Sequence, residues 1–159
     1  MVSFVTRMPA GFAGRITRDI QQAVVENEQF DSTGIPAAFG LFVKTVSGKM
    51  QQADTIASIT GAAVRPDIMQ STTNAIGNVA PVASAVCNRL RQGYFSAVSA
   101  YGTPALDGIV YMRLDTGGNG GTVGQLEATS DTSHNAAVTG AFWNGAPDAS
   151  GVAEIRYNL

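Results

Sequence analysis

The chain has 159 residues, of which 14% are charged and 18 are glycine, and its formal net charge is −2. This length is typical of one domain with one packed core, and it argues against a multidomain enzyme. Few charged residues and many glycines favour β-structure, because helix surfaces draw on charged side chains and turns draw on glycine. A slightly acidic chain is not built around nucleic-acid phosphates, so we expect no direct nucleic-acid partner.

Cys87 is the only cysteine, so no intrachain disulfide can form and synthesis in the cytoplasm fits. The N-terminal residues lack the apolar core of a signal peptide, because Arg7, Arg15 and Arg18 interrupt it. Residues 68–88 carry no charge, but they include Gln, Asn and Pro, whose insertion into a bilayer is unfavourable. We therefore expect neither export nor a membrane-spanning segment.

The predicted elements begin after an extended arm. Residues 1–20 mix Gly, Pro and Arg without a period of 2 or 3.6, so we expect them to contribute little to the core. A first strand is predicted at 22–28, and turn residues follow it at 31–36. The strongest hairpin signal lies in 41–52, where apolar β-formers flank a short turn that contains glycine.

The rest of the chain continues this pattern. A short strand pair is predicted at 55–60 and 63–65, and a neutral loop follows at 67–83. Beyond the loop, apolar runs recur about every ten to fifteen residues, which is typical of a sandwich or barrel. These runs are 85–92, 94–100, 108–114, 122–129, 137–143 and 152–159. The sequence therefore predicts an all-β fold, a single β-barrel or jelly-roll-like sandwich domain over 21–159 with an N-terminal arm over 1–20.

Two of the runs alternate well enough to assign faces. Residues 109–114 place Met112 on one face and Arg113 on the other, and 152–159 place Glu154 opposite its apolar neighbours. Alternation with period 2 indicates antiparallel strands with one buried face. We therefore expect a half-buried sheet with these charged side chains on its solvent face.

Candidate catalytic groups are few. His134 is the only histidine, and its polar neighbours indicate a solvated loop in preference to a general base or metal ligand. Cys87 follows Val86 in an apolar run, so a small core residue is the favoured interpretation over a nucleophile. No cluster of His, Cys and carboxylates has the spacing of a metal site. We expect no enzyme activity, no metal and no cofactor.

Asp115, Thr116 and Gly117 follow an apolar strand, which is the active-site signature of aspartic proteases. That chemistry needs two such aspartates that share a proton across a two-fold axis. The glycine-rich run 117–121 is too flexible to hold a carboxylate to the tolerance of catalysis, so a hairpin loop is favoured. The same run lacks the Gly-Lys-Ser/Thr ending of a phosphate-binding loop.

Arg89 and Arg91 lie two residues apart in a predicted strand, so they project from the same face. Two interpretations remain open for them. They are either a solvated strand face, which is the commoner case, or a site for an acidic partner.

A set of short motifs in a fixed order covers most of the chain. They are PAGFAG (9–14), FGLFVK (39–44), VSGK (46–49), VRP (64–66), RQGY (91–94), GIVYMR (108–113), VGQLEA (123–128), TGAF (139–142), Asp148 and AEI (153–155). With these motifs the chain resembles the structural cement, or capsid decoration, proteins of tailed bacteriophages. No motif in the set has catalytic content.

The resemblance implies a function as well as a fold. It implies a cement protein on the outer surface of the virion capsid, made in the host cytoplasm, that bridges major capsid protein subunits and stabilises the DNA-filled shell. The implied partners are the major capsid protein and further copies of the chain, as a homodimer or homotrimer. The alternative is a virion β-module that binds a host receptor or glycan, with Tyr101 or Trp143 as an aromatic platform.

The arm is the predicted contact segment. Its ordering is unfavourable for an isolated chain, so we expect it to become ordered against a capsid subunit or an adjacent protomer. The predicted contact residues are its aromatic and basic side chains: Phe4, Arg7, Phe12, Arg15 and Arg18.

Overall fold

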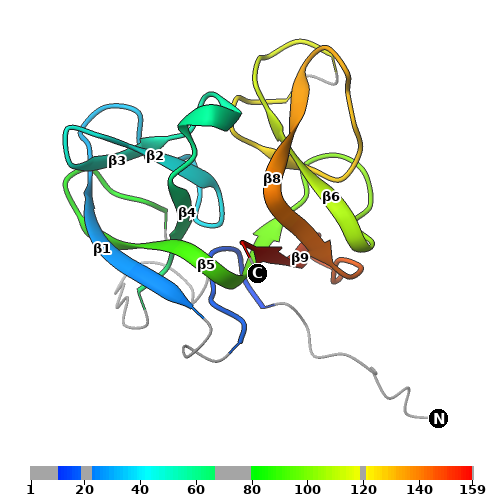
Figure 1. Ribbon diagram of the computed structural model, residues 1–159, viewed down its shortest axis with the longest axis horizontal. Helices are drawn as coiled ribbons and strands as arrows, with labels where there is room; N and C mark the ends of the chain where they lie inside the picture. Colours follow the sequence, from blue (N-terminus) through cyan, green and yellow to red (C-terminus); the bar gives the residue numbers. More distant parts are fainter. Residues whose placement is uncertain (1–10, 19–22, 67–79, 119–120, 159) are drawn as a thin grey trace.

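A computed structural model describes residues 11–18, 23–66, 80–118 and 121–158 (Figure 1). Within these residues the chain is all-β, as predicted, and its one helical element is a single 3-10 turn, η2 (Ile56–Ser58). The strands are β1 (Val24–Phe30), β2 (Phe42–Val46), β3 (Lys49–Gln52), β4 (Gly61–Val64), β5 (Val86–Val98), β6 (Leu106–Arg113), β7 (Leu126–Glu127), β8 (Asn135–Asn144) and β9 (Val152–Tyr157). The described part of the chain contains no helix long and apolar enough to span a membrane.

The first five strands form a closed ring, here called the first barrel. Its strands are hydrogen-bonded in the order β1, β3, β2, β4 and β5, and β5 pairs back with β1. All these pairings are antiparallel except β1 with β3. Closure gives every strand of the ring a neighbour on both sides, and β1 and β3 meet through two residue pairs, Gln29 with Lys49 and Phe30 with Met50.

The C-terminal half of β5 belongs to a second ring, here called the second barrel. Its order is β5, β9, β8, β6 and β7. A parallel bridge between Tyr101, just after β5, and Glu127 of β7 closes the ring, supported by the bond from the Ala128 amide to the Tyr101 carbonyl at 2.8 Å. The barrels are thus fused through one long strand, and Figure 1 shows β5 running from one lobe into the other.

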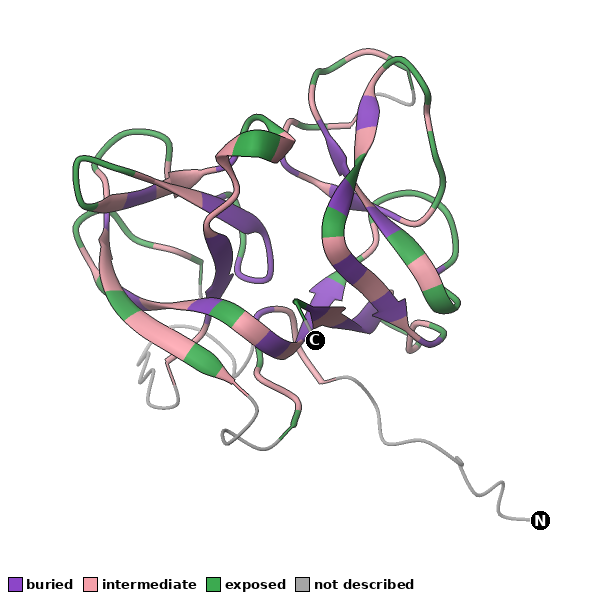
Figure 2. Ribbon diagram, viewed as in Figure 1, coloured by how far each residue is buried: buried purple, intermediate pink, exposed green. Residues whose placement is uncertain are grey.

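One core joins the two barrels. The interior of the second barrel includes Trp143 and Phe95, and Phe42 and Leu90 of the first barrel pack into the same cluster. The rings of Phe42 and Tyr157 lie 5.1 Å apart across this junction. A smaller cluster draws on all five strands of the first barrel. Figure 2 shows the buried residues on the strands and the exposed ones mostly on the loops. Because residues of both barrels belong to one core cluster, the two lobes are packed into one body.

The predicted elements differ from the observed ones in three places. The runs predicted at 85–92 and 94–100 form the single strand β5, which continues through Gly93 at φ +137°. The strand predicted at 55–60 is wrong, because this segment is a loop with a 3-10 turn whose Ile56 and Ile59 pack on the core. The run predicted at 122–129 forms only the two-residue strand β7, after a turn at Val123 and Gly124. Most of the predicted loop at 67–83 lies outside the described residues.

Candidate functional site

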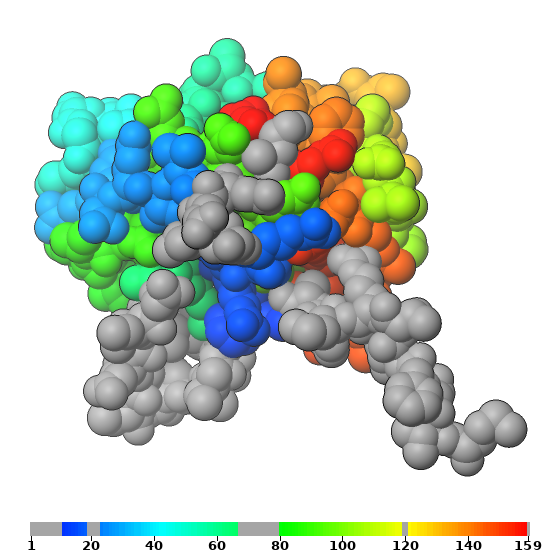
Figure 3. All heavy atoms as spheres, turned by 60° about the horizontal axis from the view of Figure 1, so that its bottom comes forward, coloured from blue at the N-terminus to red at the C-terminus, as the bar shows by residue number. Residues whose placement is uncertain are grey.

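Residues 11–18, here called the strap, lie beside the C-terminal part of β5. They occupy the same edge of β5 with which β1 pairs over residues 86–92. The Thr17 amide donates to the Tyr94 carbonyl at 3.1 Å, and the Ser96 amide donates to the Arg15 carbonyl at 2.9 Å. Figure 3 shows the strap on the surface of the face that is turned forward. The described part of the predicted arm is therefore bound to the domain by one β-bridge, between Ile16 and Phe95, and by these backbone hydrogen bonds.

An arginine sandwich holds the first end of the strap. The Arg65 guanidinium carbon lies 4.8 Å from the centre of the Phe12 ring and 5.2 Å from that of Phe39. Arg65 also donates from Nε to the Ala13 carbonyl at 2.9 Å. Gly14 is buried beside Phe39 at φ +80°, and a Cβ there would lie 2.3 Å from the Cβ of Phe39. Only glycine fits this close approach without displacement of the strap.

Glu154 of β9 holds the other end. Its carboxylate accepts hydrogen bonds from Thr17, from Asn144 and from Arg18, whose Nη2 lies 2.9 Å away. The Arg18 guanidinium also covers the ring of Tyr94, 4.1 Å from its centre. Burial opposes the charged form of Glu154, but these bonds outweigh it and hold its pKa below the usual value. The strap is thus tied to the second barrel by a nearly buried carboxylate.

Arg15 lies between the two anchors and differs from its neighbours. Its side chain is exposed, and its guanidinium carbon lies 6.0 Å from the centre of the Phe12 ring. Within the described residues, no carboxylate lies within ion-pair distance of it. Among the described residues, the strap region therefore combines Arg15, Arg18 and Arg65 with the acid Glu154, so this part of a chain of net charge −2 is locally basic.

The predicted contact residues thus separate into three groups. Phe4 and Arg7 lie outside the described residues. Phe12 and Arg18 are engaged by their own chain, and Arg15 is available for a partner. Sequence reasoning missed Arg65 and Glu154, the two anchors, because each comes from a strand far along the chain and no local pattern connects it to the strap.

His134 and Asp115 meet at the loop end of the second barrel. Nδ1 of His134 lies 2.7 Å from Oδ1 of Asp115, which also accepts the Gly117 amide at 2.8 Å. The Gly117 carbonyl accepts from Arg113 at 2.7 Å, which ties the loop to β6. The described residues contain no group of three or more His, Cys, Asp or Glu that could hold a metal ion. The Asp115 segment is thus an ordered loop in which the carboxylate has structural partners.

Two other candidates lie in the core. Cys87 is buried with Sγ 3.1 Å from the Val64 carbonyl oxygen, and burial raises the pKa of its thiol to about 11. Trp143 is fully buried and donates its indole N–H to the Glu127 carbonyl at 3.4 Å. Neither a reactive thiolate nor an exposed tryptophan platform is therefore formed.

Arg89 and Arg91 do project from one face of β5, as predicted, and Glu26 of β1 pairs with both. Arg89 also lies 3.1 Å from Glu28. A groove of about 560 Å³ opens beside these arginines and is lined also by Ile59 and Tyr157. Because the two arginines face two glutamates of the same chain, the groove has no excess positive charge with which to select an acidic partner.

Comparison with known proteins gives one family. The model of the XM1 gp53 minor capsid protein family matches residues 1–157. A chain in the solved structure titled "The capsid of Myoviridae Phage XM1" has the same fold, with a TM-score of 0.65 at 19% sequence identity over 98% of this chain and 95% of that one. No curated protein matches the chain. With almost its whole length matched by the family model, the chain belongs to the XM1 gp53 minor capsid protein family.

Proposed function

We propose that the protein is a structural cement of a bacteriophage capsid, which binds the outer surface of the shell and bridges major capsid protein subunits. Membership of a minor capsid protein family supports a structural role in the virion. The observation that carries the finer assignment is Arg15, exposed on a strap whose two ends are fixed by Arg65 and Glu154. An anchored segment that presents a cation with no ion pair among the described residues is preorganised for an acidic partner.

A cement protein acts through the area of its contacts and the number of its copies on the shell, and this function requires no catalytic group. Each copy that binds across a seam between capsid subunits favours the closed shell, because it binds that state and not the separated subunits. Several contacts on one rigid body also act together, so modest individual affinities give strong attachment. The fused barrels supply such a body, and the strap supplies a contact at its surface. Phe4 and Arg7 extend the proposed contact beyond the described residues.

The test compares two charge reversals in binding to empty shells assembled from the major capsid protein. Arg15→Glu changes the proposed contact. Lys49→Glu is the matched control, because Lys49 also has no ion pair within the described residues but lies in β3 of the first barrel. We expect Arg15→Glu to weaken binding about tenfold or more and Lys49→Glu to leave it within about twofold. Equal binding by both variants would show that Arg15 does not take part in the contact.

Copy number and position test the cement function against the host-binding alternative. Electron microscopy of the particle should show the protein in many copies spread over the shell. A few copies at the tail would instead support a receptor-binding or glycan-binding module. Trp143 is buried and provides no platform for such a ligand, whereas Tyr101 is 46% exposed and is the residue to substitute in that case.

A further inference from the structure

An exposed apolar patch lies on the outer face of the second barrel and is built by a β-bulge. Leu106 and Ile109 of β6 are 68% and 43% exposed. Residues three apart in a regular strand point to opposite faces, but here Leu106 pairs with Asn144, and Ile109 pairs with Phe142. Since Phe142 and Asn144 share a face of β8, the bulge at Asp107 turns both aliphatic side chains outward.

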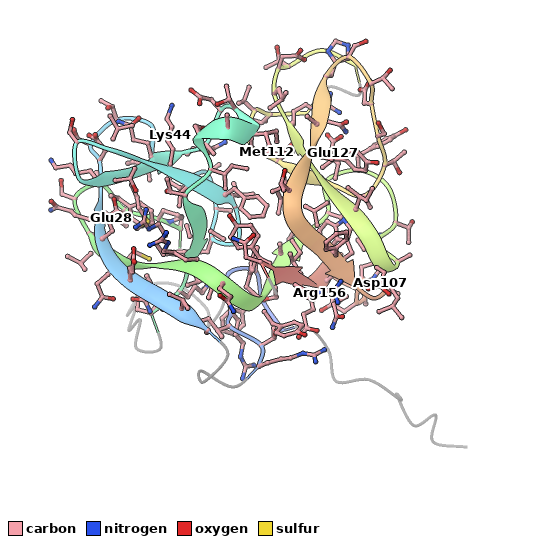
Figure 4. The ribbon with its side chains drawn as sticks, in the orientation of Figure 1. Glu28, Lys44, Asp107, Met112, Glu127 and Arg156 are labelled. Atoms are coloured by element: carbon pink, nitrogen blue, oxygen red, sulfur yellow. The ribbon has the colours of Figure 1, made fainter. Side chains whose placement is uncertain are left out.

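The bulge also neutralises the charges around these side chains. Asp107 has φ +58° and reaches across β8 to Arg156, with Oδ1 3.4 Å from Nη2. The Arg156 guanidinium in turn covers the ring of Phe142, 5.2 Å from its centre. Figure 4 shows Asp107 and Arg156 side by side at this end of the barrel. We call Leu106, Ile109 and Phe142, with the Asp107–Arg156 pair, the bulge patch.

Two features of the bulge patch are unfavourable in an isolated protein. A left-handed backbone conformation is less favourable for residues with a side chain than for glycine, although aspartate adopts it more readily than most. Two large aliphatic side chains in water gain nothing from burial until a partner covers them. A bulge that brings them together is therefore a feature of a contact surface.

We propose that the bulge patch is the contact between two copies of this chain, related by a two-fold axis. This inference rests on the proposed function and deepens it, because it adds a contact between copies of the chain to the contact with the capsid. Along residues 106–110, β6 pairs with β8 alone among the described strands, so a second copy would contact this strand edge as well as the side-chain face of the patch. In a two-fold contact the same patch meets itself, so a patch whose one acid and one base are already paired brings no like-charge repulsion.

The electrostatics separate this surface from the strap. Across a two-fold axis through the strap, Arg15 of one copy would approach Arg15 of the other, and like charges disfavour that contact. The strap is therefore suited to an acidic partner of another kind, and the bulge patch is suited to a second copy. The two surfaces nevertheless adjoin, because Asn144 bonds Glu154 on one side and pairs with Leu106 on the other.

The test compares Leu106→Asp with Val86→Asp by analytical ultracentrifugation at high micromolar concentration. Val86 is the matched control, because it is 66% exposed at the start of β5 in the first barrel. We expect the unchanged protein and Val86→Asp to form dimers of equal strength. We expect Leu106→Asp to weaken dimerisation about tenfold or more. Unchanged circular dichroism and thermal unfolding show that the variant is folded, and Ile109→Asp serves as a second variant at the same patch.

Three results would overturn the inference: a monomeric unchanged protein, dimerisation that Leu106→Asp and Ile109→Asp leave intact, or equal loss with Val86→Asp. Binding of the same variants to empty shells is measured separately. A dimer that depends on Leu106 but does not bind shells contradicts the proposed function and leaves this inference standing. If monomers of the unchanged protein bind shells and Leu106→Asp abolishes that binding, the patch contacts the capsid protein instead, and the inference of a second copy is wrong.

Discussion

The guanidinium of Arg113 and the carboxylate of Glu127 form an ion pair, with Nε and Oε1 2.6 Å apart, inside the loops of the second barrel. Neither side chain is accessible to solvent beyond 1%. Asn135 donates to the second oxygen of Glu127, and Arg113 donates to the Gly117 carbonyl. One buried pair thus connects β6, β7, β8 and the loop after β6.

Removal of one charge from this pair should destabilise the protein strongly. Glu127→Gln leaves the buried Arg113 cation with only its longer, 3.4 Å contact to Asp131, and we expect a loss of about 3–5 kcal/mol in the free energy of unfolding. Asp54→Asn is the control, because the Lys44–Asp54 pair is exposed and its loss should cost about 1 kcal/mol or less. Urea denaturation measures both, and equal losses would show that burial of the Arg113 pair does not matter.

Cys87 should be chemically silent in the folded protein. The thiolate is the reactive form, and a pKa of about 11 together with burial keeps the thiol protonated and inaccessible at neutral pH. We expect a coloured disulfide reagent to leave Cys87 unmodified at pH 8 in buffer and to modify it fully in denaturant. Rapid modification in buffer would contradict the packing of the first barrel.

Local signals predicted the parts of the fold that depend on neighbouring residues. The hairpin of β2 and β3 was predicted because apolar β-formers flank a glycine turn, and the turn lies at Ser47 and Gly48, both with positive φ. The fusion of two barrels through β5 could not be predicted. It depends on which distant strands pair with each half of that strand, and alternation in one strand carries no such information.

The residues missed at the sites share one physical cause. Alternation places Arg113 opposite Met112, and it places Glu154 on the outer side of β9, which indicated solvated side chains. Each of them is instead covered by a segment from elsewhere in the chain. Loops cover Arg113, and the strap covers Glu154. A pattern with period 2 assigns the face of a side chain but not what packs over that face.

The Asp115 loop offers a test of the protease-like signature. Asp115→Asn keeps an oxygen that can accept the Gly117 amide, so we expect the thermal unfolding midpoint to change by no more than a few degrees. Attachment to shells should also be unchanged, because Asp115 lies outside the proposed contacts. Digestion of an unfolded protein substrate is the second readout. Cleavage by the unchanged protein that is absent in Asp115→Asn would establish an aspartic-protease activity and contradict the structural interpretation.

The strap should loosen in acid, because its anchor is a carboxylate. The pKa of Glu154 in the folded protein lies below its ordinary value of 4.5, since the bonds from Arg18, Thr17 and Asn144 outweigh the effect of burial. A lowered pKa contributes stability that is fully present above the unfolded-state value and is lost as the pH falls through the folded-state value. Protection of the Thr17 and Ser96 amides against hydrogen exchange should therefore be high at neutral pH. It should decrease once the pH is lowered below the ordinary pKa of glutamate.

Two variants distinguish this mechanism from general acid unfolding. Glu154→Gln removes the charge that Arg18 binds, so both amides should be less protected at neutral pH and their protection should depend less on pH. Glu26→Gln is the control, because Glu26 also has a lowered pKa but pairs with Arg89 and Arg91, away from the strap. It should leave the protection of Thr17 and Ser96 unchanged at neutral pH. Protection of these amides that stays constant from neutral to strongly acid pH would show that Glu154 does not hold the strap.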